Sequence, residues 1–116
     1  MRHRKKKNHL NRPKGSRKAL VCNLLKSLFQ YERIKTTPPR ARELLKIAEH
    51  LISLAKEDNL SSRHYAFSYL QDKGIVTKLF KIIGPRNKER KGGYIRTYKI
   101  APRSGDAAPL VLVQLL

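Results

Sequence analysis

The chain has 116 residues, enough for one compact domain with a modest core and too few for two sizeable ones. Its 27 Lys and Arg outnumber 8 Asp and Glu, giving a formal net charge of +19, which indicates a polyanionic partner, most commonly nucleic acid. The single Cys22 excludes an internal disulfide and fits a reducing compartment, and without an apolar run of about 20 residues we expect a soluble intracellular protein with no membrane partner.

Residues 1–18 are predicted to form a basic N-terminal arm ahead of a single globular domain at residues 19–116. The arm contains nine Lys or Arg and no acid, and its only sizeable apolar side chains are Met1 and Leu10. It cannot bury enough apolar surface to offset the entropy of ordering, so we expect it to be disordered until phosphates supply partners. Its candidate RNA-binding cations are Arg2, Arg4, Lys5, Lys6, Lys7, Arg12, Lys14, Arg17 and Lys18.

Apolar spacing predicts four helices in the globular domain. The first covers roughly residues 17–32, with Ser16 as its N-cap, because apolar side chains recur there at intervals of four. The second begins at Thr37 and Pro38, and its apolar residues repeat every three or four positions up to Ala55.

The third and fourth predicted helices are shorter. Ser61 or Ser62 is expected to start the third, whose last apolar residue is Leu70, and the fourth is expected to stop at Gly84 and Pro85. The apolar faces of the helices together predict a core. Its named members are Leu24, Leu28, Leu45, Ile52, Leu79 and Phe80.

The C-terminal part of the chain predicts β-structure. The segments GYIRTYKI at 93–100 and PLVLVQLL at 109–116 have the composition of strands, and the turn-rich PRSGDAA between them suits a hairpin. The β-prone IKTT at 34–37 is a candidate third strand. We therefore expect an α+β fold, in which about four helices pack on a small, three-stranded antiparallel sheet.

Residues 90–99, RKGGYIRTYK, contain four cations, two adjacent glycines and two tyrosines, and no acid. The glycines allow either close approach to a sugar-phosphate chain or simply a bulge or loop before the strand. In a regular strand Tyr94, Arg96 and Tyr98 share a face, which suits stacking on unpaired bases and binding of phosphate. The alternative is that both tyrosines belong to the core, and Arg96 favours RNA because a buried unpaired cation is costly.

Catalytic or metal chemistry has little support in the sequence. His50 and His64 lie on predicted helices without a Cys or carboxylate at a ligand spacing, and no Walker loop, nucleophile elbow or zinc-protease motif is found. We expect neither enzymatic activity nor a cofactor, metal or small-molecule substrate. The remaining alternatives are a DNA-compacting basic protein, which would bind duplex without shape preference, and a small RNA-processing enzyme, for which no catalytic constellation is found.

Several short motifs, in order along the chain, carry a family resemblance. They are MRHRK, LNRP, IKTT, LISLAKED, IVTKLF, GPR, KGGYIRTYK and RSGDAAPLVLVQLL. Over nearly its whole length the sequence resembles the family of bacterial-type large-subunit ribosomal protein number seventeen. It departs from the family at PKGSRK, where Ser and His are common, and at Ile95, where Thr is common.

This resemblance implies a structural component of the large ribosomal subunit, without enzymatic activity, in a cytoplasmic or organellar ribosome. It implies binding to large-subunit ribosomal RNA near the rim of the nascent-chain exit, beside neighbouring large-subunit ribosomal proteins. The matching positions are Arg2, His3, Asn11, Arg12, Lys35, Thr36, Thr37, Arg86, Gly92, Gly93, Tyr94, Arg96 and Lys99. The basic zone at residues 84–103 adds Arg90 and Lys91 as candidate phosphate contacts.

Overall fold

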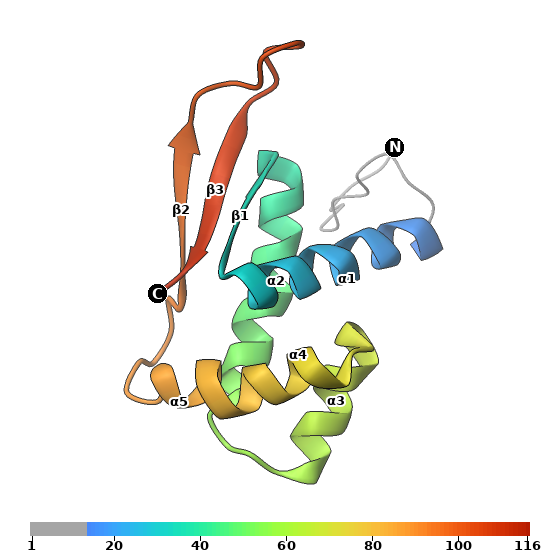
Figure 1. The fold of residues 1–116 in the computed structure, drawn as a ribbon, viewed down its shortest axis with the longest axis vertical. Helices are drawn as coiled ribbons and strands as arrows, with labels where there is room; N and C mark the ends of the chain where they lie inside the picture. Colours follow the sequence, from blue (N-terminus) through green and yellow to red (C-terminus); the bar gives the residue numbers. More distant parts are fainter. Residues whose placement is uncertain (1–13) are drawn as a thin grey trace, which may run out of the picture.

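A computed structural model describes residues 14–116, and it has the predicted α+β architecture (Figure 1). Four helical segments pack with a three-stranded antiparallel sheet in this part of the chain. The helical elements are α1 (Lys14–Tyr31), α2 (Pro38–Ala55), α3 (Leu60–Leu70) and a continuous run of α4 (Lys73–Lys78), η1 (Leu79–Ile83) and α5 (Gly84–Arg86). The strands are β1 (Arg33–Thr36), β2 (Ile95–Ile100) and β3 (Leu110–Leu115).

Helix α2 is the central element of the fold (Figure 1). Helix α1 crosses it, α3 and the α4–α5 run pack at one of its ends, and the sheet lies beside its other half. Within residues 14–116, helices thus cover one side of the sheet and leave its second face open. This layering is the usual way for a half-apolar antiparallel sheet to bury one face.

The predicted hairpin forms, and the third strand joins it on the far side. Strand order is β1-β3-β2, with both pairs antiparallel, so the C-terminal strand is the central one. At the hairpin tip Arg103 donates to Asp106 at 2.9 and 3.1 Å, and this interaction, aided by the Ala108 N–H, lowers the pKa of Asp106 to about 2. Backbone hydrogen bonds of 2.9 Å from the Arg103 N–H to the Ala108 carbonyl and from the Ala107 N–H to the Arg103 carbonyl close the turn, and the ion pair adds to them.

Burial alternates along β1 and along the second half of β3, which separates two faces, whereas Arg96 to Lys99 of β2 are all exposed. Val113 and Leu115 are buried on the helix side, together with Thr36, while Ile34 and Val111 pack partly against the core. Because successive side chains of a strand point to opposite faces, the residues between them point away from the helices. The open face of the sheet is therefore defined by the register of the three strands.

The helices bury the predicted stripes, with an offset of one residue at two positions. Leu28, Ile52, Leu79 and Phe80 are buried as predicted. The prediction was wrong for Leu24 and Leu45, which are only partly buried, whereas their neighbours Leu25 and Leu44 are fully buried. Both helices have apolar residues on a broad arc, so the contacts of neighbouring elements decide which residue occupies the centre of the buried face.

Two helix starts differ from the predicted ones. Helix α1 begins at Lys14 rather than near residue 17, so residues 14–18, assigned to the arm, are helical. Helix α3 begins at Leu60 rather than at a serine, because the N-cap is Asn59, whose side chain accepts a hydrogen bond of 2.8 Å from the Ser62 N–H. Asparagine is as good an N-cap as serine, so the DNLSS sequence offered competing starts.

The prediction that the fourth helix stops at Gly84 and Pro85 was wrong. The helix widens into the π-helical turn η1, in which the Gly84 N–H donates to the Leu79 carbonyl, and it continues through Arg86. The wide turn lies just before Pro85, which has no N–H to donate to the helix. Gly84 has a packing role instead, because a Cβ there would lie 2.2 Å from the Ala55 carbonyl oxygen.

Candidate nucleic-acid interface

The open side of the sheet, here called the outer sheet face, is assembled from all three strands. Residues paired across neighbouring strands point to the same face of the sheet. Arg33 and Arg96 both pair with Gln114, and Lys35 and Tyr98 both pair with Leu112. The eight residues of the outer sheet face are Arg33, Lys35, Arg96, Tyr98, Ile100, Leu110, Leu112 and Gln114. Cations thus occupy both edge strands, with an amide and an apolar side chain on the central strand between them.

This face is positively charged and has no internal counterion. Arg33, Lys35 and Arg96 are exposed, and none of the three has an ion pair with any residue of the described part of the chain. None of the eight acidic residues lies on it. Several of those acids pair with cations elsewhere, namely Glu32, Glu43, Asp58 and Asp106. The open face of the sheet can therefore accept an anionic partner.

The predicted contacts on the strands divide between the two faces. Lys35 and Arg96 lie on the outer sheet face, whereas Thr36 and Lys99 face the other way, on either side of Val111. Thr36 is only 6% exposed, while Lys99 stays exposed on the edge strand. Thr37 is the N-cap residue of α2, which begins at Pro38 close to the predicted start, although the Thr37 side chain makes no capping hydrogen bond.

The two tyrosines that were expected to act together are in different environments. Tyr94 is 3% exposed, and Tyr98 is 41% exposed. The Tyr94 N–H donates to Glu49 Oε2 at 3.3 Å, its hydroxyl donates to the Arg90 carbonyl at 3.4 Å, and Lys56 Nζ lies 4.7 Å from its ring centroid. Tyr94 is therefore a core residue, and of these two tyrosines Tyr98 is the one whose ring is accessible to a base.

The loop before β2 turns sharply into the strand at Gly93. Gly93 has φ +63°, a left-handed value that glycine adopts without strain, and it directly precedes the buried Tyr94. A Cβ at Gly92 or Gly93 would meet no atom within 4 Å, so neighbouring protein atoms do not require these glycines. Arg90 and Lys91 are exposed beside them, and the Arg90 carbonyl accepts a hydrogen bond from Lys56.

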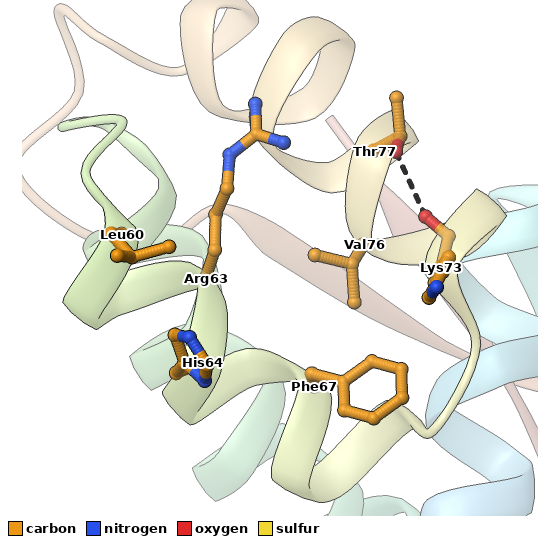
Figure 2. A pocket seen from close by; sticks show the side chains of 7 residues that line it. All are labelled: Leu60, Arg63, His64, Phe67, Lys73, Val76 and Thr77. Carbon is orange, nitrogen blue, oxygen red and sulfur yellow. Dashed lines mark hydrogen bonds between the residues drawn. The ribbon is translucent and has the colours of Figure 1, made fainter.

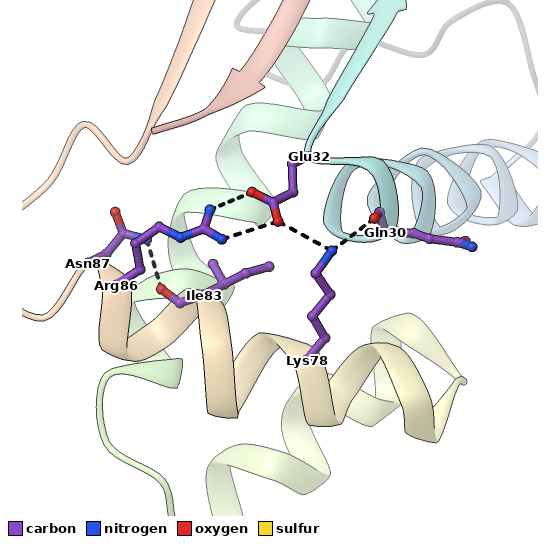
Figure 3. Close-up of polar contacts among 6 residues, drawn as sticks. All are labelled: Gln30, Glu32, Lys78, Ile83, Arg86 and Asn87. Atoms are coloured by element: carbon purple, nitrogen blue, oxygen red, sulfur yellow. Dashed lines mark hydrogen bonds and ion pairs between the residues drawn. The ribbon is translucent and has the colours of Figure 1, made fainter.

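Arg86, another predicted contact, has a partner inside the protein (Figure 3). Its guanidinium donates to both carboxylate oxygens of Glu32, at 2.5 and 3.1 Å. Lys78 lies 3.4 Å from the same carboxylate and also donates to the Gln30 carbonyl at 2.9 Å. The hydrogen bond from Arg86 lowers the pKa of Glu32 and raises that of Arg86, so this arginine is held as part of the fold.

The remaining predicted cations lie at the N-terminal end. Lys14 is the first residue of α1, and Arg17 and Lys18 border a hollow of about 230 Å³ that also contains Cys22 and Tyr69. The arm candidates Arg2, His3, Arg4, Lys5, Lys6, Lys7, Asn11 and Arg12 lie outside the described residues. Arg33 and Gln114 were not predicted, although strict alternation along RIKT would have placed Arg33 on the same face as Lys35.

A second hollow, of about 400 Å³, lies between α3 and α4 (Figure 2). It is lined by Leu60, Arg63, His64, Phe67, Lys73, Val76 and Thr77. The Thr77 hydroxyl donates to the Lys73 carbonyl at 2.8 Å, and Arg63 is held by Asp58. The lining has no carboxylate or thiol, and His64 is its one imidazole.

Comparison with known protein families gives a match. The model of the family described as ribosomal protein L17 matches residues 20–116 of the 116-residue chain. Within residues 14–116 no helix is long and apolar enough to cross a membrane, and no group of three or more His, Cys, Asp or Glu is positioned to hold a metal ion.

Proposed function

We propose that this chain, which belongs to the ribosomal protein L17 family, binds large-subunit ribosomal RNA through its outer sheet face and N-terminal residues. Membership makes it a component of the large ribosomal subunit, with a structural rather than an enzymatic role. Its surroundings are then ribosomal RNA and other ribosomal proteins. On the resemblance noted in the sequence, the proposal extends to a position near the rim of the nascent-chain exit.

The observation that carries the proposal is the set of unpaired cations on the outer sheet face. Arg33, Lys35 and Arg96 have no counterion among the described residues, although five ion pairs are made elsewhere. Neighbouring strands are about 4.8 Å apart, so cations on the two edge strands are separated by roughly 10 Å at the backbone. This arrangement suits several phosphates of one backbone, because arginine and lysine bind phosphate without reference to sequence.

The test is the salt dependence of binding to a fragment of large-subunit ribosomal RNA. In a variant with Arg33→Gln, Lys35→Gln and Arg96→Gln, each lost phosphate contact removes about 0.7 to 0.9 from the slope of log affinity against log salt. We therefore expect a slope shallower by roughly 2 and weaker binding. A matched control replaces Lys46, Lys73 and Lys81 by Gln, which removes the same charge from the helices.

The control distinguishes a local contact from a general charge effect. Equal losses in the two triple variants would contradict a role for the outer sheet face. Failure of the wild-type chain to bind the fragment, or to cosediment with large subunits in a gradient, would contradict the function itself. A DNA-compacting protein would instead be displaced from the fragment equally well by duplex DNA.

A further inference from the structure

Tyr98 is an exposed aromatic residue among the cations of the outer sheet face. It sits on edge strand β2, opposite Leu112 of the central strand, and Lys35 follows on β1. The next row of the outer sheet face contains Arg96, Gln114 and Arg33. Tyr98 and Leu112 are therefore neighbours, with Lys35 beyond Leu112 in the same row and Arg96 and Arg33 in the next row.

The Tyr98 ring has no partner within the described part of the chain. The ring pairs in this part of the chain are His50–Tyr65 and Tyr65–Tyr69. The cations near rings there are Lys56 at Tyr94 and Arg63 at Phe80. Leu112, its cross-strand neighbour, is half-buried and does not belong to the core or to its partly buried border. Tyr98 can therefore be changed without disturbing the interior, and its face is free for a ligand.

We propose that the outer sheet face holds an unpaired RNA segment, with one base stacked on Tyr98 and flanking phosphates bound by Arg96 and Lys35. This inference rests on the proposed RNA binding and specifies the form of RNA that the face recognises. A base in a duplex is stacked on its neighbours and cannot lie on a protein ring, whereas an unpaired base can. A purely electrostatic surface would need no aromatic residue among its cations.

The spacing of the residues fits one nucleotide step. Arg96 is two residues from Tyr98 along β2, which separates them by about 7 Å at the backbone. Lys35 lies two strands away, at roughly 10 Å. One long cationic side chain thus lies along the strand from the ring and the other lies across the sheet from it, so the two can reach the phosphates on either side of a stacked base. Gln114, between Arg33 and Arg96, adds an amide that both donates and accepts hydrogen bonds.

The experiment separates stacking from charge by using full-length variants and two RNAs. The probes are an unstructured 12-nucleotide RNA and a duplex RNA with the same number of phosphates, each titrated over a range of salt concentrations. We expect Tyr98→Ser to weaken binding of the unpaired RNA by about 5- to 150-fold without changing its salt slope. Tyr98→Phe keeps the ring and should bind as wild type, and Arg96→Gln should lower the slope by about 0.7.

A cross-linking experiment identifies the partner in the assembled particle. Benzoylphenylalanine at position 98 should form photo-cross-links to ribosomal RNA in purified large subunits. Cross-links to protein alone would overturn the inference in favour of a protein contact at this face.

Three results in solution would also overturn it. They are wild-type affinity of Tyr98→Ser for the unpaired RNA, an equal loss on the duplex, or a loss in Tyr98→Phe as large as in Tyr98→Ser. In all three cases ribosomal RNA binding by the wild-type chain would stand, so the proposed function would survive. Conversely, a wild-type chain that binds no ribosomal RNA fragment would contradict the function before the stacking is tested.

Discussion

Glu32 and Arg86 join the end of α1 to the end of the fourth helical segment, although 54 residues separate them. Glu32 has φ 65°, which turns the chain from α1 into β1 and places the carboxylate opposite the arginine. The two hydrogen bonds measure 2.5 and 3.1 Å. The same pair therefore fixes the direction in which the first strand leaves the helices, and it occupies an arginine that sequence alone assigned to RNA.

Replacing Glu32 by Gln should lower stability modestly and in a pH-dependent way. Both side chains are about one third exposed, so solvent screening limits the cost to about 1 kcal/mol or less. The pKa of Glu32 is lowered from 4.5, so its carboxylate contributes stability above that value, and the contribution is lost as the pH falls through the folded pKa. Urea denaturation at pH 7 and pH 3 measures the difference.

The two proteins should therefore differ less at pH 3 than at pH 7. A gap that widened in acid would contradict the ion pair. As a companion, Arg86→Gln should leave the salt slope of RNA binding unchanged, in contrast to Arg96→Gln.

Gly84→Ala should destabilise the protein, by about 1 to 3 kcal/mol or more, because the new methyl group collides with backbone. A Cβ at Gly84 would lie 2.2 Å from the Ala55 carbonyl oxygen, and this atom cannot move without displacing the end of α2. Gly92→Ala is the matched control, since its Cβ would meet nothing within 4 Å. Thermal melting of the two variants distinguishes them, and equal melting temperatures would contradict the close packing of α5 on α2.

Leu44→Ala should cost more stability than Leu45→Ala, although the two residues are adjacent. Leu44 is fully buried, and Leu45 only borders the core. Truncation of a fully buried leucine costs about 2 to 5 kcal/mol, whereas a partly exposed site loses less apolar burial and leaves no closed cavity. Chemical denaturation measures both, and a larger loss for Leu45→Ala would mean that α2 is rotated from the orientation described.

Tyr94→Ala should mainly lower stability, whereas Tyr98→Ala should mainly lower RNA affinity. Loss of the buried Tyr94 ring is expected to destabilise the protein by about 3 to 5 kcal/mol, the usual cost of removing a core aromatic. The exposed Tyr98 should change stability by no more than about 0.5 kcal/mol. Denaturation midpoints and RNA affinity are measured together, and a stable Tyr94→Ala protein with weakened RNA binding would reverse the two assignments.

Removing residues 1–12 should make RNA binding weaker and less dependent on salt. This segment contains six Lys or Arg, and each phosphate contact that they make contributes about 0.7 to 0.9 to the slope. Binding to the same ribosomal RNA fragment is compared for the full-length and truncated chains. Identical slopes would show that these cations do not contact phosphate in the complex.

Local patterns were sufficient to predict much of this protein. Repeats of apolar residues at intervals of three and four located α2 closely, and the turn chemistry of PRSGDAA located the β2–β3 hairpin. These features depend on neighbours in the chain, whose periodicity and turn residues are visible in the sequence. The excess of Lys and Arg likewise indicated an anionic partner without any knowledge of the fold.

Other features depended on residues that are distant in the chain. Gly84 resembles a helix stop, but the approach of Ala55 makes it a packing site, and Arg86 resembles a phosphate ligand, but Glu32 binds it. Tyr94 and Tyr98 are an even number of residues apart, as residues on one face of a strand are, yet Tyr94 is buried and Tyr98 is exposed to a partner. Tertiary contacts decided these cases, because burial and ion pairing are set by whichever element packs opposite, and periodicity along one segment does not specify that element.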